Sequence, residues 1–198
     1  MPTGVALRNV RQQLFDAAEL VLLRDGVNGL TSRAVTVEAG CAKGVLHRHF
    51  ADFDAFLAEL VQDRITRIRA QAAELTESAG TGTVVASLTG ALTELFGSVA
   101  VAIIALVTSR DELRARLRES HPSGVPVLAE GVAMIAAYLT AERDLGRVAA
   151  DADVDTLALM LIGTGHLLFA DRKENPLERS AVEQVVVGVV ADVVTPSH

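Results

Sequence analysis

Apolar residues recur along most of this chain at the three- and four-residue spacing that is typical of helices. The pattern predicts an all-α protein, with helices over about residues 7–24, 52–76, 84–98, 99–108, 111–119, 127–143, 153–171 and 176–194. The segment 111–119 has few apolar positions, so we expect it to be exposed. Residues 185–194, VVVGVVADVV, favour a strand by composition, but we expect a helix because Asn175 and Pro176 are typical of a helix start.

The clearest break in the chain is SAGTGT at residues 78–83, and the long helix before it bridges two parts. We expect a small N-terminal domain over residues 1–50 and a larger helical domain over residues 51–198. No internal repeat is evident.

Between these helices, the segment LTSRAVTVEAGCAKGVLHRHF at residues 30–50 predicts two short helices bent around Gly40, which suits a left-handed helix end. Thr31 or Ser32 can cap the first helix with a side-chain oxygen. The same helix N-terminus favours a phosphate group. The apolar positions that we expect to face inward are Val35, Ala39, Ala42, Leu46 and Phe50.

The outward face of the second helix is short or cationic. Lys43 and His47 share one exposed side, and Gly44 and Arg48 share another. Gly44 permits a close approach to DNA, while Lys43 and Arg48 suit phosphates or a guanine edge in the major groove. Val45 suits a thymine methyl group. A plain surface hairpin is the alternative, but it does not require the inward positions, turn glycine and cationic face to agree.

The motif A-G-x-x-x-G-x-L-x-x-H-F is present as Ala39, Gly40, Gly44, Leu46, His49 and Phe50. With RDGVNGLT at the end of the first helix, residues 8–60 resemble the DNA-binding domain of the TetR (tetracycline repressor) family. The resemblance implies a three-helix helix-turn-helix domain followed by a helical dimerisation and ligand-binding domain. It implies phosphate contacts by Thr31, Ser32, Lys43, His47 and His49, and contacts to bases or nearby backbone by Arg33, Val45 and Arg48.

The sequence departs from the family pattern at several positions. The family usually has Tyr at His47, a small hydroxyl residue at Ala42, Thr or Ser at Val45, Ala at Thr36 and Lys at Phe53. Phe53 removes an expected phosphate contact, whereas His47 keeps a hydrogen-bonding tip and gains charge below about pH 6.5. Arg8 and Arg11, near the start of the first helix, either reach DNA or are solvated.

The net charge of −7 argues against a protein that coats nucleic acid through bulk charge. Residues 1–76 contain nine basic and nine acidic residues, whereas residues 77–198 contain nine basic and sixteen acidic residues. A neutral reading domain on an acidic body suits targeted DNA binding with weak nonspecific attraction. The single cysteine, Cys41, excludes an internal disulfide. We expect it to pack as a small apolar residue, with redox sensing as the alternative.

The family pattern also implies a homodimer in which the helices at about 153–171 and 178–194 pack against their copies. The stretch VDTLALMLIGTGHLLFA is apolar nearly all round, which is more than one core contact requires. The final helix offers Val182, Val185, Val186, Val189, Val190 and Val193. Burial inside a monomer is the alternative. A dimer would present two reading helices to a palindromic double-stranded operator.

Family members bind small molecules among the helices of the body, so the resemblance implies a small-molecule effector. The candidate lining residues are Leu88, Leu92, Phe96, Ile103, Ile104, Met134, Tyr138 and His166. Ordinary core packing is the alternative for each of them. The scarcity of charge in this set favours an apolar or neutral ligand.

Catalytic and metal sites find little support in the sequence, so we expect no enzyme activity, metal or cofactor. The run GTGH at residues 163–166 lies within a helical pattern and lacks the lysine of a phosphate-binding loop. His47 and His49 diverge on a helix, and Asp151, Asp153 and Asp155 lack the glycine and glutamate of a calcium loop.

The N-terminus lacks the apolar region of a signal peptide, and the longest apolar run, Val99 to Val107, is too short to span a bilayer, so we expect a cytoplasmic protein. Two hypotheses follow for its function. The first is a dimeric transcriptional regulator, a repressor that a ligand releases from its operator. The second is a helical small-molecule-binding protein or enzyme on the same scaffold that does not bind DNA.

Overall fold

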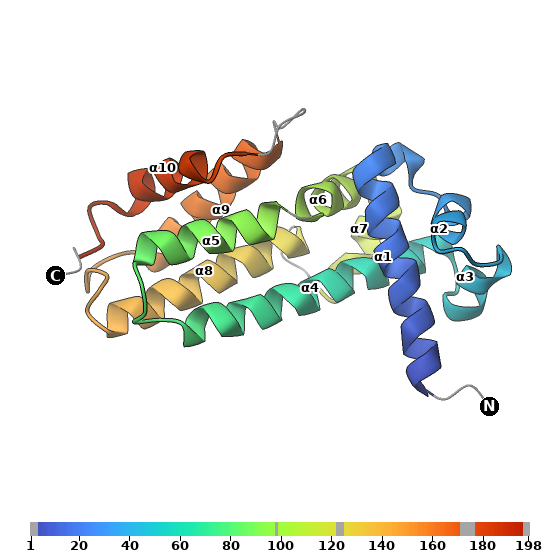
Figure 1. Ribbon diagram of the computed structural model, residues 1–198, viewed down its shortest axis with the longest axis horizontal. Coiled ribbons are helices and arrows are strands. Elements are labelled where there is room, and N and C mark those ends of the chain that lie inside the picture. The colour runs from blue at the N-terminus through green and yellow to red at the C-terminus, as the bar shows by residue number, and fades with distance from the viewer. Residues whose placement is uncertain (1–3, 98, 122–124, 171–176, 196–198) are drawn as a thin grey trace. The chain divides into compact units, whose positions relative to one another are not determined.

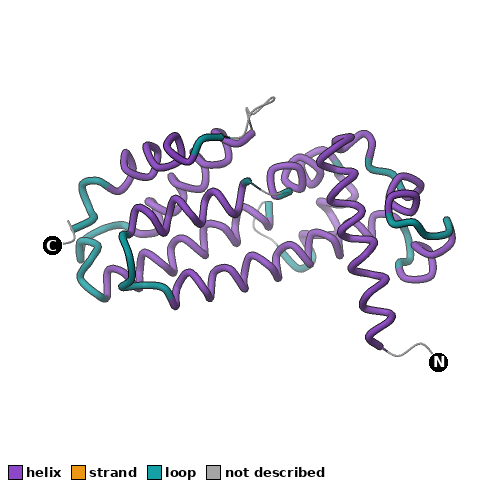
Figure 2. The backbone as a smooth tube through the Cα atoms, in the orientation of Figure 1, coloured by secondary structure: helices purple, strands orange, loops and turns teal. Residues whose placement is uncertain are grey.

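The computed structural model describes residues 4–97, 99–121, 125–170 and 177–195, with side chains from residue 10 onward. The regular secondary structure of these residues is helical (Figures 1 and 2). One isolated antiparallel β-bridge, between Val148 and Val194, is the only strand-like pairing among the described residues. The helices are α1 (Gly4–Gly29), α2 (Ser32–Glu38), α3 (Gly44–His49), α4 (Phe53–Glu77), α5 (Val84–Phe96), α6 (Ala100–Ser109), α7 (Asp111–Arg118), α8 (Pro126–Asp144), α9 (Val154–Ala170) and α10 (Arg179–Val190). The all-α fold class is confirmed.

Contacts divide the chain into two compact units, one of residues 1–63 with 102–124 and one of residues 64–101 with 125–198. The first unit includes the expected DNA-binding domain over 1–50, and it adds the start of α4, most of α6 and all of α7. Helix α4 carries the chain from the first unit into the second.

The core of the first unit forms where the inward stripe of α1 meets α2, α3 and the start of α4. Its fully buried apolar side chains include Leu14, Val21, Leu22, Val35, Leu46, Phe56, Leu57 and Leu60. Burial of such a side chain contributes about 1.5–3 kcal/mol. Gly26, with φ +70°, breaks the helical geometry of α1 near the end that the sequence predicts.

Helix α7 is not the exposed helix that its composition predicts. Leu113 and Leu117 are both buried, because their four-residue spacing puts them on one face of the helix. The charged residues around them stay exposed or half-buried. Two apolar positions are therefore enough to anchor this short helix in the first unit.

In the second unit, α5 packs against α8, α9 and α10, and α9 packs against both α8 and α10 (Figure 1). A Cβ atom built on Gly165 of α9 would lie 2.9 Å from the Phe96 ring of α5. A Cβ atom on Gly131 of α8 would lie 3.0 Å from Leu95. These glycines therefore allow close helix packing within one subunit, whereas a Cβ atom on Gly163 would meet nothing within 4 Å.

One predicted cap is confirmed, because Asp153 accepts a hydrogen bond from the backbone N–H of Thr156 at 3.1 Å. Asn175 and Pro176 lie outside the described residues, but the predicted helix start there is wrong, since α10 begins at Arg179 with Glu178 as its N-cap. Of the run at residues 185–194, the part up to Val190 is helical, whereas Val194 forms a bridge with Val148. Among the described helices, none is by itself long and apolar enough to cross a membrane. Only the bent pair of α5 and α6 has the required length and apolar composition when the two are counted together.

Candidate nucleic-acid interface

The turn between α2 and α3 is built as its sequence predicts. Thr31 caps α2, because its Oγ1 accepts a hydrogen bond from the Ala34 N–H at 3.1 Å. Gly40 adopts φ +63°, and the N–H of Cys41 then donates to the Thr36 carbonyl at 3.0 Å. The chain thus leaves α2 through a left-handed glycine and turns into α3.

Helix α3 begins at Gly44 and buries one side. Leu46 is fully buried and Phe50, which ends the helix in an extended conformation, is 4% exposed. Ala42 is exposed, so its predicted inward position is wrong. The four-residue spacing from Ala42 to Leu46 has no meaning here, because Ala42 lies in the turn before the helix.

An arginine from α1 fixes the end of α3. The Arg11 Nη1 atom donates to the His49 carbonyl at 3.2 Å, and the guanidinium lies 4.5 Å from the centre of the Phe50 ring. Arg11 also forms an ion pair with Glu59. Arg11 is therefore not merely solvated, and its contacts link α1 to the end of α3 and to α4. The side chain of Arg8 lies outside what the structure describes.

Aromatic packing continues this support beneath α3. The Phe50 ring lies 5.8 Å from Phe15 and 5.0 Å from Phe56, so α1, α3 and α4 meet at one cluster. Phe53, at the position where the resemblance implies a lysine, stacks on Phe56 at 5.7 Å. The guanidinium of Arg110 lies 5.8 Å from the centre of the Phe53 ring. The substitution therefore extends the aromatic cluster.

Another departure is Thr36, a buried hydroxyl at a position where the resemblance implies alanine. Its Oγ1 donates within its own helix, to the Ser32 carbonyl at 3.0 Å and the Arg33 carbonyl at 3.1 Å. The hydroxyl is thereby satisfied without a partner elsewhere, which is the common solution for a threonine within a helix.

The expected DNA-contacting residues lie on the surface of α2, α3 and the turn between them. The exposed residues are Thr31, Arg33, Lys43, Gly44, His47 and Arg48, and the half-buried ones are Ser32, Val45 and His49. They lie at the N-terminus of α2, at the N-terminus of α3 and along the outer side of α3. Whether they contact DNA stays a prediction.

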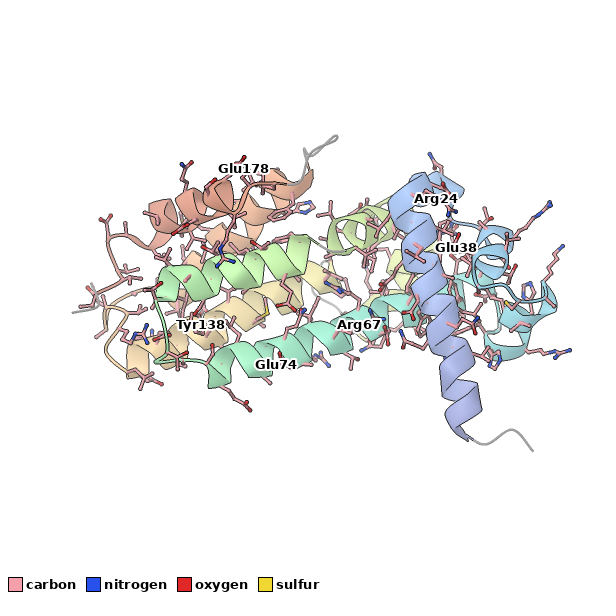
Figure 3. All side chains as sticks on the ribbon, in the orientation of Figure 1. Arg24, Glu38, Arg67, Glu74, Tyr138 and Glu178 are labelled. Carbon is pink, nitrogen blue, oxygen red and sulfur yellow. The ribbon has the colours of Figure 1, made fainter. Side chains whose placement is uncertain are left out.

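The charge on this surface is positive. Its one carboxylate, Glu38, forms an ion pair with Arg24, whose Nη1 donates to it at 2.8 Å (Figure 3). In the part of the chain that the structure describes, Arg33, Lys43 and Arg48 form no ion pair with the protein. These three cations are therefore available to a polyanion.

The candidate ligand-lining residues divide between the two units. Ile103 and Ile104 are buried in the first unit. Leu88, Leu92, Phe96, Met134 and Tyr138 are buried in the second, and half-buried His166 lies 6.1 Å from the Phe96 ring. Most of them pack in helix contacts, and Met134 alone of this set borders the cavity described next.

The second unit contains a cavity of about 290 Å³ between the end of α4, α5 and α8. It is lined by Gln71, Glu74, Leu75, Ser78, Ser87, Gly90, Ala91, Glu94 and Met134. Sequence reasoning missed the polar members of this set, because polar residues on amphipathic helices are typical of solvated faces. Their signal was the spacing itself, since residues 71, 74, 75 and 78 and residues 87, 90, 91 and 94 each form one helical stripe.

Other chemistry has no visible site among the described residues. No three His, Cys, Asp or Glu side chains there come close enough together to hold a metal ion. Cys41 is a free, half-buried thiol in the turn between α2 and α3.

Comparison with known proteins agrees with the geometry of this helix pair. No protein-family model matches the chain. Over 69 residues, or 33% of its length, the chain is 33% identical to the HTH-type transcriptional regulator PksA of Bacillus subtilis (strain 168). The match spans 34% of that relative.

Solved structures resemble nearly the whole chain. A Rhodococcus protein described as a TetR-family transcriptional regulator superposes with a TM-score of 0.71 at 19% identity, covering 95% of this chain and all (100%) of that one. Reduced NemR of E. coli gives 0.72 at 16% identity over 96% and 100% of the two chains. FadR of Bacillus subtilis, in complex with stearoyl-CoA, gives 0.65 at 20% identity over 91% and 97%.

Proposed function

We propose that this chain, which has the fold of the TetR-family transcriptional regulators, is a dimeric DNA-binding regulator that responds to a small molecule. Such a regulator acts in the cytoplasm, where its operator lies. The observation that carries the proposal is the short helix α3, which is held by Leu46 and Phe50 while Lys43 and Arg48 stay exposed and unpaired among the described residues.

The proposed DNA contacts follow from the chemistry of this surface. Arg48 is the candidate for a guanine edge, because a guanidinium can donate two parallel hydrogen bonds to the guanine O6 and N7 atoms. Lys43, Arg33 and the N-terminus of α2 at Thr31 and Ser32 are candidates for phosphates. The absence of a side chain at Gly44 permits a close approach to the groove.

The proposed dimer interface lies on α9 and α10. Helix α9 leaves Leu159 63%, Met160 49% and Leu167 70% exposed, which is unusual for large apolar side chains on one helix. The face that α10 presents is not the valine face expected from its sequence, because Val182, Val186 and Val190 are buried within the subunit. Its exposed positions are Arg179, Ser180, Glu183, Gln184, Val187 and Gly188.

A symmetric dimer through this face supports recognition of a palindrome. Two copies of α3, spaced about one helical turn of DNA apart, would read two half-sites. A ligand that binds the body of the protein with different affinities in its two conformations would shift operator affinity by that difference. FadR is described with an acyl-CoA bound, which supports a ligand role for the corresponding fold here. We expect the response to be release from DNA, as in a repressor.

The decisive experiment is an electrophoretic mobility shift with DNA that flanks the gene of this protein. We expect specific, salt-sensitive binding, and we expect Arg48→Ala to lose about 1–3 kcal/mol of operator affinity and to relax specificity at one base. Lys43→Ala should weaken binding across sequences and reduce the salt dependence. Arg114→Ala, on a half-buried arginine of α7 paired locally with Asp111, is the matched control and should bind as the wild type does.

A scaffold that has lost DNA binding is the competing function, because Phe53 packs on Phe56 where the resemblance implies a phosphate-binding lysine. No operator binding at low salt, in a protein that still binds a small molecule, would support that function over the regulator. Unchanged affinity in both Arg48→Ala and Lys43→Ala would refute the proposed reading face.

A further inference from the structure

The cavity in the second unit has an acidic, uncompensated lining. Glu74 of α4 and Glu94 of α5 both border it, and no Lys, Arg or His is among the residues that line it. Glu94 accepts a hydrogen bond from the Gln71 amide at 2.7 Å, which is a neutral partner. Arg69, the nearest preceding arginine of α4, is engaged with Glu130 at 3.0 Å. Two exposed carboxylates therefore border the cavity, and no cation among the described residues pairs with either of them.

The rest of the lining is apolar or uncharged. Leu75, Ala91 and Met134 contribute apolar surface, and Gly90 leaves space that any side chain would fill, since a Cβ atom there would meet nothing within 4 Å. A site with an apolar body and a few placed polar groups is typical of small-molecule binding. Methionine, which is flexible and polarizable, adapts to different ligand shapes.

An independent observation comes from Tyr138, one helical turn beyond Met134 on α8 (Figure 3). Its side chain is fully buried, yet its hydroxyl forms no hydrogen bond of normal geometry. Its polar neighbours are Glu142, which pairs with Arg147 at 3.3 Å, and Ser87, which lines the cavity. Buried hydroxyl groups are rarely left unsatisfied. The Tyr138 hydroxyl therefore lies beside Ser87, a residue of the cavity lining, without a hydrogen bond of normal geometry.

We propose that this cavity binds an organic cation, an amine or ammonium carried on an apolar body, with Glu74 and Glu94 facing the charge and Leu75, Ala91 and Met134 contacting the body. This ligand class replaces the apolar or neutral one that the buried candidate residues favour in the sequence. Only the regulatory effect of the ligand rests on the proposed function, since binding of the ligand itself needs no DNA.

Three probes of equal length test the assignment, namely 4-phenylbutylamine, 4-phenylbutanol and 4-phenylbutanoate, which are cationic, neutral and anionic at pH 7. Binding is measured by calorimetry on the full chain without DNA. Tyrosine fluorescence gives a second readout, because the protein has one tyrosine, Tyr138, and no tryptophan. We expect the amine to bind about tenfold more tightly than the alcohol, and the butanoate to bind most weakly.

Variants separate the charge from the cavity. Glu74→Gln combined with Glu94→Gln should weaken the amine about tenfold and leave the alcohol unchanged. Glu77→Gln, three residues further along α4 and outside the lining, is the matched control and should change neither affinity. Gly90→Leu should fill the cavity and abolish binding of all three probes, with an unchanged thermal unfolding midpoint to show that the fold is intact.

Equal affinities for the three probes, a preference for the butanoate, no binding of the amine at millimolar concentration, or unaltered amine binding in Gly90→Leu would overturn the assignment. Failure of the two proposals is distinguishable. An amine that binds without changing operator affinity upholds the ligand class and refutes the proposed response. Operator binding by a protein with no preference for the amine refutes the ligand class alone.

Discussion

Arg110, just before α7, donates from Nη2 to the Asp54 carboxylate in the first turn of α4 at 2.8 Å. Arg116 of α7 similarly contacts Asp52 at 3.1 Å. Asp52 itself caps α4, since its Oδ1 accepts the Ala55 N–H at 2.6 Å. The start of α4 directly follows α3, so these two ion pairs connect α7 to the segment that joins α3 to α4.

We expect Asp54 and Arg110 to be energetically coupled. Both side chains are about one-third exposed, at 28% and 33%, so the pair should be worth about 0.5–1 kcal/mol in a double-mutant cycle on the free energy of unfolding. The Asp111–Arg114 pair lies within α7 and provides the control, for which we expect only about 0.3 kcal/mol. A coupling energy of zero for Asp54 and Arg110 would show that the contact does not stabilise the first unit.

The two glycines that flank the turn between α2 and α3 should differ in their tolerance of alanine. Gly40→Ala should destabilise the protein by about 1–2 kcal/mol, because Gly40 has φ +63° and an alanine there is strained. Gly44 has no such φ, and a Cβ atom there would meet nothing within 4 Å. Gly44→Ala should therefore unfold like the wild type in urea while binding operator more weakly. Equal stability losses in both variants would contradict this assignment of roles.

The local chemistry of the first unit could be predicted from sequence because it depends on short-range rules. A threonine cap, a left-handed glycine and apolar positions four residues apart identified α2, the turn and the buried side of α3. The same spacing rule failed at Ala42, where it was extended across a turn. It also missed the anchoring of α7, because two leucines among charged residues give a weak pattern.

Contacts between distant segments could not be predicted. Arg11 looked like a residue for solvent or DNA, and only the folded arrangement brings it to His49 and Glu59. The cavity residues of α4 and of α5 are separated in sequence by a loop. The spacing within each helix therefore does not indicate that the polar stripe of α4 faces that of α5. The valines of α10 illustrate the same limit, since periodicity shows that they share a face without showing which neighbour that face meets.

The pH dependence of stability should report the buried tyrosine. Burial, helped by the neighbouring Glu142, raises the pKa of Tyr138 to about 12. In the unfolded chain the pKa is about 10. The folded protein therefore holds this proton more tightly, so the contribution of Tyr138 is constant below pH 10 and falls between pH 10 and 12.

Urea unfolding at pH 8 and pH 11 measures this effect. The wild type should lose about 1 kcal/mol more than Tyr138→Phe over this interval, because the variant keeps the ring and lacks the ionisable hydroxyl. Absorbance at 295 nm gives an independent check, since Tyr138 is the single tyrosine. An ionisation midpoint near pH 10 in the folded protein would contradict the predicted environment.

The exposed apolar side chains of α9 predict how the proposed dimer can be broken. Leu159→Glu and Leu167→Glu place a charge on side chains that are 63% and 70% exposed in one subunit, so neither should disturb the subunit fold. If α9 packs against its copy, each glutamate would be desolvated in the interface, and the dimer should weaken by several kcal/mol. The measurement is the molar mass by sedimentation or light scattering over a concentration series.

Leu23→Glu, on a 58% exposed leucine of α1, is the matched control and should leave the assembly state unchanged. A monomeric wild type, or a dimer that survives both α9 substitutions, would place the pairing surface elsewhere and would remove the geometric basis for reading a palindrome.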